Sequence, residues 1–346
     1  MRRGIWDFIR DQWTPQQPLV KVDLTAKTVI VLGANAGLGF EAAKHFATMN
    51  PGRLILACRS QSRGQAALEK LSAATGYTKA ELWIVDLADF ESVKAFADRF
   101  QREGGRLDIF VENAAILMDK YEPSKDGWET AFQVSCLSTP LLAFLLLPTM
   151  IKTAREHSTV PRLVVVSSEM HYWASIEKEV RENPDMLKTF GSQEYCTPTR
   201  MASRYLLTKL LNVFFVRALN ARLANTTPLI VDAVNPGLCH SELTRGLTGI
   251  VATLERLFAF FFAYSTEVGS RHLVWAAIAH QEKQEEEKLR GAFIHGCRVT
   301  EPSDFVLSEE GRKTEDRLWD ELVEILGKVD PRVTKTVEEY LSPVAA

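Results

Sequence analysis

The sequence places a tyrosine and a lysine four residues apart, Tyr205 and Lys209, within a stretch of helical periodicity. This spacing puts both side chains on one face of a helix. A phenol has a pKa of about 10, and a neighbouring ammonium group stabilises the phenolate and lowers that pKa. Such a tyrosine can donate a proton to a carbonyl oxygen or accept one from an alcohol. Because the spacing is common by chance, a purely structural role is the alternative.

A serine is the second candidate for this chemistry. Ser168 closes the apolar run Arg162–Val166, and the carboxyl ends of strands in open α/β sheets face the ligand crevice. Its hydroxyl can hydrogen-bond a substrate oxygen beside Tyr205, although a turn or helix cap also explains a serine there. The sequence therefore predicts proton transfer between Tyr205 and an oxygen that Ser168 orients.

Glycines mark a candidate phosphate site. Gly33, Gly37 and Gly39 follow the apolar run Thr28–Leu32 and precede helical periodicity. Glycine lets the backbone approach a ligand, and a helix N-terminus offers free N–H groups to a pyrophosphate. The spacing is G-x-x-x-G-x-G, without the Gly-Lys-Ser/Thr of a P-loop hydrolase. A plain turn is the alternative, but the position after the first strand favours a dinucleotide.

The apolar run that follows the glycine loop, Arg53–Ala57, indicates which dinucleotide the chain binds. An NAD site usually places an acid at the tip of the second strand, whereas here the tip carries Arg59, with Arg63 nearby. An arginine suits a 2′-phosphate, so NADP(H) is the predicted cofactor; a surface cation is the alternative. Asp86 ends the third run, where it can contact adenine or cap a helix. Asn235-Pro236-Gly237 ends the sixth, where the nicotinamide half should lie.

Buried-strand runs alternate with helical periodicity along the chain, which predicts a parallel sheet with crossover helices. The predicted strands are Thr28–Leu32, Arg53–Ala57, Glu81–Val85, Leu107–Val111, Arg162–Val166, Leu229–Val234 and Gly291–His295. Predicted helices cover residues 38–49, a segment ending at 71, 90–100, 127–154 and 201–223. We expect an α/β chain: a single-domain Rossmann fold with a doubly wound, mostly parallel sheet of about seven strands flanked by helices.

The amino-acid composition narrows the functional class and the location of the protein. The 346 residues include 41 Lys+Arg and 44 Asp+Glu, so no basic excess points to nucleic acid. Five scattered cysteines without a CxxC pair indicate reduced thiols, a cytoplasmic location and no metal site. The first residues lack the pattern of a signal peptide, and no apolar run is long enough to span a membrane. Residues 1–14 carry an apolar stripe that packs on the domain or a second subunit, or else contacts a membrane surface.

Together these residues resemble the short-chain dehydrogenase/reductase family. The resemblance rests on G-x-x-x-G-x-G, Asp86, Asn113-Ala114-Ala115, Ser168, Y-x-x-x-K and Asn235-Pro236-Gly237, in the family's order. It covers residues 25–300, preceded by a preamble (1–24) and followed by a helical tail (301–346). The chain is most similar to the retinol-dehydrogenase and WW-domain-oxidoreductase-like branch, and to its fungal members.

The resemblance implies a role for each matching residue. Tyr205 would be the general acid/base, Lys209 would lower its pKa and hold the nicotinamide ribose, and Ser168 would polarise the substrate carbonyl. The implied cofactor-binding residues are Gly33, Asn35, Gly37, Leu38, Gly39, Arg59, Asp86, Leu87, Asn113, Ala114, Tyr205, Lys209, Pro236, Gly237, Leu238 and Ser241. Family members are often homodimers or homotetramers.

The chain also departs from the family pattern. Leu32 stands where the family usually has Thr, Glu112 replaces the first Asn of Asn-Asn-Ala-Gly, and Ala115 replaces its Gly. Ser135 stands where the family has the Asn that holds a helix bend and a water of the proton relay. Ser135 is therefore a catalytic candidate with a shorter reach. A dinucleotide-binding sensor or scaffold with impaired catalysis is the alternative function.

The substrate pocket should be formed by two variable stretches, residues 169–200 and 238–264, which follow strand ends. The first contains the substrate candidates His171, Tyr172, Trp173 and Tyr195, and the second is rich in Leu and Phe. This content favours a small lipophilic or aromatic ketone, aldehyde or alcohol. The alternative is that these residues cover the core or a subunit interface.

Overall fold

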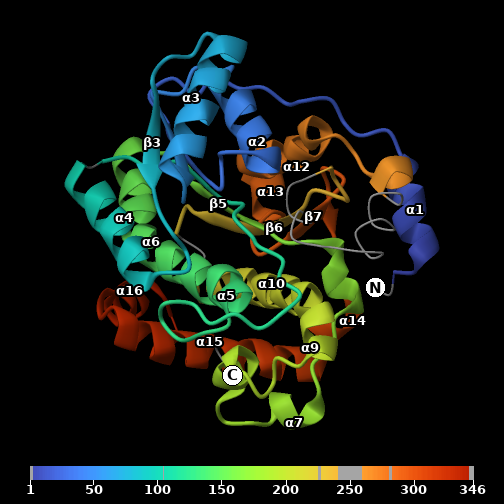
Figure 1. Ribbon diagram of the computed structural model, residues 1–346. Coiled ribbons are helices and arrows are strands. Elements are labelled where there is room, and N and C mark those ends of the chain that lie inside the picture. Colours follow the sequence, from blue (N-terminus) through green and yellow to red (C-terminus); the bar gives the residue numbers. More distant parts are fainter. Residues whose placement is uncertain (1–2, 104, 225–226, 241–258, 280–282, 343–346) are drawn as a thin grey trace.

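The structure is a computed structural model that describes residues 3–103, 105–224, 227–240, 259–279 and 283–342. Eight strands form one sheet in the order β3-β2-β1-β4-β5-β6-β7-β8 (Figure 1). The strands are β1 (Thr28–Leu32), β2 (Arg53–Cys58), β3 (Ala80–Ile84), β4 (Ile109–Glu112), β5 (Arg162–Val166), β6 (Ile230–Asn235), β7 (Phe293–His295) and β8 (Val299–Thr300). All neighbouring pairs are parallel except β7 and β8.

Helices connect and follow these strands. They are α1 (Ile5–Trp13), α2 (Gly37–Ala47), α3 (Gln61–Thr75), α4 (Phe90–Glu103), α5 (Thr130–Phe132), the π-helix η1 (Gln133–Ser138), α6 (Thr139–His157), the 3₁₀ helix η2 (Glu169–Trp173), α7 (Lys178–Arg181), α8 (Met186–Gly191), α9 (Pro198–Ala202), α10 (Arg204–Arg222), α12 (Thr266–Ile278), α13 (Lys283–Glu287), α14 (Asp304–Leu307), α15 (Glu309–Val329) and α16 (Arg332–Tyr340).

The predicted α/β fold with a doubly wound parallel sheet is confirmed. Each of the seven predicted strands is present, and the bounds of Thr28–Leu32 and Arg162–Val166 match β1 and β5. These two strands are buried along their whole length, as continuous apolar runs predict for strands covered on both faces. The eighth strand, β8, was not predicted, because two partly exposed residues carry no apolar pattern.

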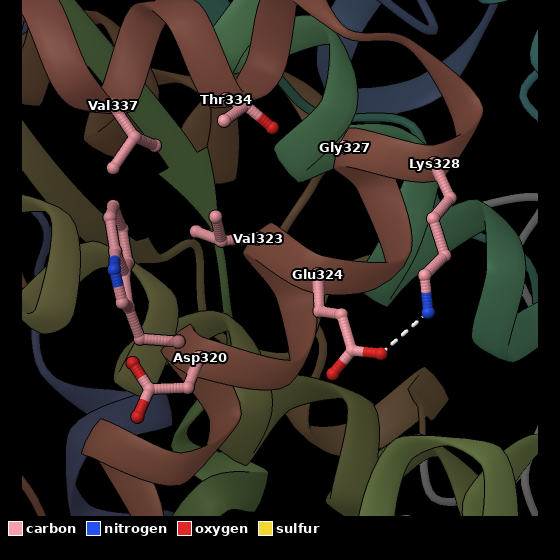
Figure 2. Close-up of a pocket in the computed structure, with 8 residues that line it drawn as sticks. Asp320, Val323, Glu324, Gly327, Lys328, Thr334 and Val337 are labelled. Atoms are coloured by element: carbon pink, nitrogen blue, oxygen red, sulfur yellow. Dashed lines mark hydrogen bonds and ion pairs between the residues drawn. The ribbon is translucent and has the colours of Figure 1, made fainter.

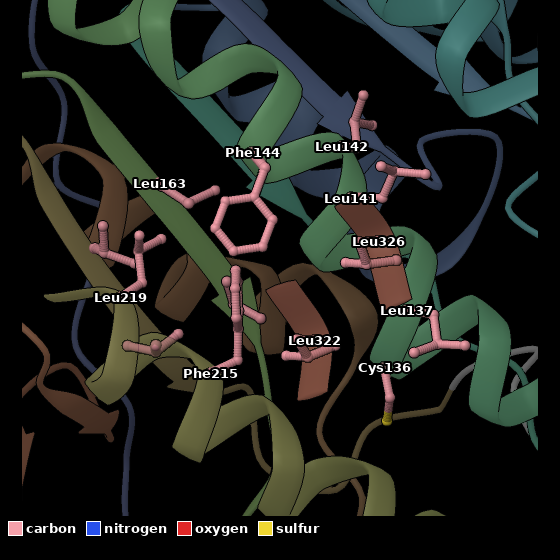
Figure 3. Packing of buried hydrophobic residues seen from close by; sticks show 14 of the residues in the cluster. Cys136, Leu137, Leu141, Leu142, Phe144, Leu163, Phe215, Leu219, Leu322 and Leu326 are labelled. Atoms are coloured by element: carbon pink, nitrogen blue, oxygen red, sulfur yellow. The ribbon is translucent and has the colours of Figure 1, made fainter. Parts of the chain in front are cut away.

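Two hydrophobic cores lie on opposite faces of the sheet. One face is covered by α2, α3 and α12, and the other by α4, α6 and α10 (Figure 1). On the second face α15 packs against α10 and α16 against α6, so the tail adds an outer layer. Figure 3 shows Leu322 and Leu326 of α15 beside Phe215 and Phe144. The tail therefore shares the main core.

The segment predicted as one helix, residues 127–154, is divided into α5, η1 and α6. In a π-helix the hydrogen bonds run from i to i+5, and such bulges occur frequently at functional sites. Ser135 lies in the middle of η1 and is buried. The bend thus lies where the resemblance to the family places one.

The expectation that no segment is long and apolar enough to span a membrane is wrong for one helix. Residues 130–157 pass that test by length and composition, with a mean hydropathy of 1.9. However, 89% of the most apolar window is buried inside the protein. Core helices of soluble proteins pass the same test, so this feature is weak support for a membrane span.

The preamble packs on the domain through α1, which buries Phe8, Asp11 and Gln12. Its boundary at residue 24 and the other predicted boundaries stay predictions. All five cysteines are free. No group of three or more His, Cys, Asp or Glu side chains in the described part of the chain is placed to hold a metal ion.

Candidate active site

The predicted catalytic residues come together where β5 ends and α10 begins. Tyr205 and Lys209 lie in the first turns of α10, and the Lys209 ammonium is 5.4 Å from the centre of the Tyr205 ring. Ser168 caps η2, with its Oγ accepting from the Met170 amide at 3.2 Å. The Ser168 side chain also faces the Tyr205 phenol, whose pKa it lowers. Ser168 therefore acts as a cap and also faces Tyr205.

Burial sets the protonation of this cluster. It raises the pKa of Tyr205 to about 12, and the Ser168 side chain opposes that rise. Burial also lowers the pKa of Lys209 to about 8. The Lys209 ammonium donates to the Val166 carbonyl at 2.7 Å, which fixes its place beside the end of β5. Near neutral pH the Tyr205 phenol therefore carries its proton, and Lys209 is charged in most molecules.

An amide lies at the bend where the family has its Asn, and it comes from Asn212, one turn beyond Lys209. In the amide orientation that satisfies both its nitrogen and its oxygen, the nitrogen donates to the Ser135 carbonyl at 2.8 Å and to the Thr208 carbonyl at 3.2 Å. In the opposite orientation the nitrogen donates to the Val166 carbonyl at 3.5 Å. The sequence analysis missed Asn212. Its position three residues after Lys209 was the available signal, because that spacing places both on one helix face.

The glycine loop has the geometry of a dinucleotide cradle. Gly33 and Gly37 have φ of +74° and +61°, which favour glycine. A Cβ at Gly39 would lie 2.5 Å from both the Gly33 carbonyl oxygen and the Asn113 amide nitrogen. Asn113 donates to the Leu32 and Gly33 carbonyls at 3.2 and 3.3 Å, so it braces the loop.

This loop fits a pyrophosphate. Helix α2 begins at Gly37, its first N–H groups have no intrahelical partner, and its first turn carries no acidic side chain. Nothing lies within 4 Å of where a Cβ at Gly37 would be, so the backbone is open on that side. Asn35 and Leu38 flank Gly37 in the same loop. The residues present therefore suit a dinucleotide cofactor.

The residues predicted for the adenosine half lie at the tips of β2, β3 and β4. Arg59 follows β2 and is exposed. The Asp86 carboxylate accepts from the Ala88 amide at 3.0 Å, so it also orders the turn after β3. The Leu87 carbonyl accepts from Ser138 at 2.6 Å, which ties that turn to the π-helix. Ala114 lies within 3.0 Å of where a Cβ of Gly33 would be.

Glu112, the first residue of the altered Asn-Asn-Ala-Gly motif, is buried at the end of β4. Burial raises the pKa of its carboxyl group well above the usual range. A protonated carboxyl is neutral and offers one donor and one acceptor, as an amide offers donors and an acceptor. Burial therefore disfavours a negative charge at this strand end.

The turn after β6 contains the residues predicted for the nicotinamide. Gly237 has φ of +77°, and its amide donates to the Asn235 side chain at 3.1 Å. Pro236 is buried, and Leu238 is half-buried. Ser241 lies outside the described residues.

The substrate candidates make several internal contacts. His171 is buried, and its ring donates from Nδ1 to the Ser168 carbonyl (2.8 Å) and accepts at Nε2 from the Ser303 amide (3.2 Å). Burial lowers the pKa of His171 to about 4, in keeping with this neutral form. Both ring nitrogens therefore brace the backbone.

The other three substrate candidates are also held by protein groups. The Tyr172 hydroxyl donates to the Glu301 carbonyl, and the Trp173 indole donates to the Arg3 carbonyl at 2.9 Å. Tyr195 donates to Glu177 at 3.2 Å. Trp173 and Tyr195 stay partly exposed, and a substrate role for any of the four stays a prediction.

A hollow elsewhere on the surface is formed by the tail alone. It measures about 570 Å³ and lies between α15 and α16 (Figure 2). An ion pair between Glu324 and Lys328 (2.6 Å) lies along it. None of the residues that line it belongs to the candidate active site.

Comparison with known proteins gives the same picture. A family model described as short chain dehydrogenase matches residues 27–175. A short chain dehydrogenase/reductase, dmxR8, of Cryptosporiopsis sp. is 35% identical over 94% of this chain and 98% of its own. Retinol dehydrogenase 12 of Mus musculus is 33% identical over 88% of each chain.

Solved structures share the fold at low identity. A putative uncharacterized protein from Mycobacterium paratuberculosis has a TM-score of 0.64 at 24% identity, with 88% of this chain and 94% of that one covered. L-sorbose reductase from Gluconobacter frateurii, solved with NADPH and L-sorbose, has a TM-score of 0.57 at 18% identity, covering 80% and 98%.

Proposed function

The chain belongs to the short-chain dehydrogenase/reductase family, and on that premise we propose that it is an NADP(H)-dependent reductase of ketones or aldehydes. The observation that carries the proposal is the cluster of Tyr205, Ser168 and Lys209 at the carboxyl edge of the sheet. A phenol, a hydroxyl and a buried ammonium within one cluster suit proton transfer to a carbonyl oxygen. The glycine loop that fits a dinucleotide lies at the same edge of the sheet, after β1, which β4 separates from β5.

When bound, the nicotinamide cofactor would supply the hydride that reduces the substrate carbonyl carbon. The Ser168 hydroxyl orients and polarises the carbonyl oxygen, and Tyr205 donates its proton to that oxygen as the alcohol forms. The Lys209 ammonium stabilises the resulting phenolate, which regains a proton from solvent. Because burial keeps Tyr205 protonated near neutral pH, the cluster is set for reduction more than for oxidation.

The cofactor preference rests on the tip of β2. Arg59 is exposed there, in place of the acid that usually binds a ribose 2′-hydroxyl, and a guanidinium pairs with phosphate through two hydrogen bonds. The solved L-sorbose reductase of the same fold holds NADPH. Both points support NADP(H) over NAD(H).

The substrate class rests on the segments beside the cluster. Tyr172 and Trp173 lie in η2, directly after Ser168, and Tyr195 lies shortly before α9 and α10. Aromatic walls favour a small lipophilic or aromatic carbonyl compound. The sequence similarity to retinol dehydrogenase 12 of Mus musculus is in keeping with a lipophilic substrate. A cytoplasmic location and a homodimer or homotetramer remain part of this proposal.

The alternative, a sensor or scaffold without efficient catalysis, was motivated by Ser135 and Glu112. Two observations weaken that motive. Asn212 brings an amide to the Ser135 carbonyl, and burial of Glu112 disfavours its charged form. Asn212 is therefore part of the proposed catalytic arrangement, as the residue that holds the bend against α10.

The test combines cofactor binding with turnover of a panel of lipophilic ketones and aldehydes. We expect NADPH to bind, and Tyr205→Phe to lower kcat by about 10²- to 10⁴-fold while NADPH affinity stays within about twofold. The variant removes only the hydroxyl, so the matched control is Tyr195→Phe, which should keep most activity. Turnover retained in Tyr205→Phe would refute the mechanism, and NADPH binding without turnover of any substrate would favour the sensor.

Membrane contact through residues 1–14 has a structural basis of its own. Ile5, Trp6 and Trp13 are exposed on α1, and Phe260 and Phe261 are exposed close to its end. Tryptophan is enriched at membrane interfaces. Pelleting with phospholipid vesicles should be reduced by Trp6→Ser together with Phe260→Ser; equal pelleting of wild type and variant would remove the membrane from the proposal.

A further inference from the structure

Helix α1 is packed in an unusual orientation. It buries Asp11 and Gln12 and exposes Trp6, whose side chain is 78% accessible. A surface helix normally buries its apolar stripe, because burying polar groups costs free energy unless they are hydrogen-bonded. The buried polar residues of α1 must therefore have specific partners, and those partners lie at the active site.

Gln12 is bonded to the turn that follows β6. Its amide nitrogen donates to the Leu238 carbonyl at 3.0 Å and to the Phe262 carbonyl at 2.8 Å. Its oxygen accepts from the Leu238 amide at 3.1 Å. One side chain thus satisfies both backbone groups of Leu238, as a neighbouring strand would, although the two residues are 226 positions apart in the sequence.

Gly237 leaves the space for this contact. A Cβ at Gly237 would lie 2.8 Å from the Gln12 side-chain oxygen, and its φ of +77° is one that favours glycine. The glycine that the sequence analysis assigned to the cofactor therefore also admits Gln12.

Asp11 reaches the same turn through a chain of hydrogen bonds. The Asn235 side chain donates to His295 Nδ1 (2.5 Å), so His295 donates from Nε2 to the Asp11 carboxylate (2.9 Å). The Asn235 oxygen then accepts from the Gly237 amide. Burial lowers the pKa of His295 to about 3, in keeping with this neutral form. The turn is thus held from both of its ends.

The same N-terminal segment contacts the loop after β5. Arg3 is ion-paired with Asp11 and lies 3.9 Å from the Glu169 carboxylate, next to Ser168. The Arg3 carbonyl accepts from the Trp173 indole, and the Phe8 ring packs edge-on against it at 6.3 Å. Four residues of this segment, Arg3, Phe8, Asp11 and Gln12, therefore link the loop after β5 to the turn after β6, and we call these four residues the N-terminal clasp.

We propose that the N-terminal clasp is a working part of the nicotinamide end of the site, with Gln12 as the positioning residue that fixes the turn Asn235–Leu238 for cofactor and substrate. This inference rests on the proposed function. It assigns a role to a segment that precedes the part of the chain matched by the family model, residues 27–175.

The test separates the two halves of the cofactor. NADPH contains the nicotinamide, whereas 2′-phosphoadenosine-5′-diphosphoribose carries only the adenosine, pyrophosphate and ribose parts. In Gln12→Glu the side chain keeps its size but loses the amide donor, so the Leu238 and Phe262 carbonyls each lose one hydrogen bond. We expect NADPH affinity or kcat to fall about tenfold or more, while affinity for the fragment stays within about twofold.

A second variant and a second measurement keep the test decisive if Gln12→Glu is unstable. Gln12→Met removes the hydrogen bonds without adding charge and should give the same split between the two ligands. Amide hydrogen exchange of apo protein should become faster at Leu238 in Gln12→Met, which lacks the oxygen that accepts from that amide, whether or not a substrate is known. The carboxylate of Gln12→Glu can still accept that bond, so exchange is judged in Gln12→Met. The matched control, Trp6→Ala, alters an exposed side chain of the same helix and should leave both affinities and the exchange unchanged.

Three results would overturn the inference. These are unchanged NADPH affinity and kcat in both Gln12 variants, an equal loss for NADPH and the fragment, or unaltered exchange at Leu238 in Gln12→Met. Wild-type protein that binds neither ligand would instead overturn the proposed function, and the inference with it. The two failures are therefore distinguishable by the behaviour of the wild type.

Discussion

The two ends of the candidate site are built in different ways. At the phosphate end, Gly33, Gly37 and Gly39 form the loop, and a single side chain, that of Asn113 in the next strand, braces it. At the nicotinamide end, the turn after β6 is held by Gln12 and, through His295, by Asp11. The first end is shaped by backbone conformation within neighbouring strands, and the second by side chains from distant parts of the chain.

This difference indicates which kind of substitution should disrupt each end of the site. A loop shaped by glycine backbone fails when a Cβ is added, because backbone atoms cannot move aside cheaply. A turn held by buried side chains fails when a donor or acceptor is removed, because its partner is left unsatisfied. The two ends should therefore respond to different kinds of substitution and affect different parts of the cofactor.

The largest effect should come from Gly39→Ala. The added Cβ would meet the Gly33 carbonyl oxygen at 2.5 Å, so the loop must shift. We expect affinity for NADPH and for the fragment without nicotinamide to fall together, by about 10- to 100-fold. Calorimetric titration of both ligands measures this.

The control for Gly39→Ala is Gly37→Ala, which adds strain at φ of +61° but meets no atom within 4 Å. It should weaken binding less than Gly39→Ala does. Wild-type affinity in Gly39→Ala would show that the loop is not shaped by this close approach.

An effect of similar size on NADPH, but selective for that nucleotide, is expected from Arg59→Ala. If the guanidinium pairs with the 2′-phosphate, its loss should weaken NADPH binding by about 10- to 100-fold and leave NADH binding within about twofold. Arg63→Ala, in the first turn of α3, is the control and should matter less. An equal loss for both nucleotides would remove Arg59 from the recognition of the phosphate.

The smallest effect should be the pH dependence of reduction. Tyr205 acts as an acid and keeps its proton up to high pH, whereas the Lys209 pKa of about 8 means that its charge is lost as pH rises through 8. We therefore expect kcat/KM to be nearly constant below pH 7 and to fall about tenfold between pH 7 and 9.

Lys209→Arg checks that assignment, because a guanidinium keeps its charge throughout this range. Its rate should be lower overall, but without the fall near pH 8. A wild-type rate that stays constant up to pH 10 would mean that the charge of Lys209 is not needed.

The sequence was sufficient for most of the fold and for the phosphate end. Strands β1 and β5 are continuous apolar runs, and the three glycines of the loop lie within seven residues of sequence. A local sequence pattern was therefore enough to predict the strands and the loop. The strand β8 was missed because it has two residues and no apolar pattern. No local pattern marked the π-bend of residues 133–138, since its residues are buried like those at the start of α6, and only the resemblance to the family indicated a bend there.

The rest of the site depends on long-range contacts that no local pattern carries. Gln12 reads as an ordinary polar residue of an exposed helix, and only the packed structure brings it to Leu238. Asn212 is likewise an unremarkable residue of α10 until the bend at Ser135 is placed beside it. Spacing within a helix finds pairs such as Tyr205 and Lys209, but it does not find a partner from another element.

The five free cysteines have a practical consequence for work with this protein. Burial raises the pKa of every one of their thiols, to about 12 for Cys136, Cys239 and Cys297. The thiolate is the form that reacts with alkylating agents and oxidants, and it is scarce when the pKa is high. The folded protein should therefore resist iodoacetamide and peroxide near neutral pH, so that modification by such reagents reports unfolding.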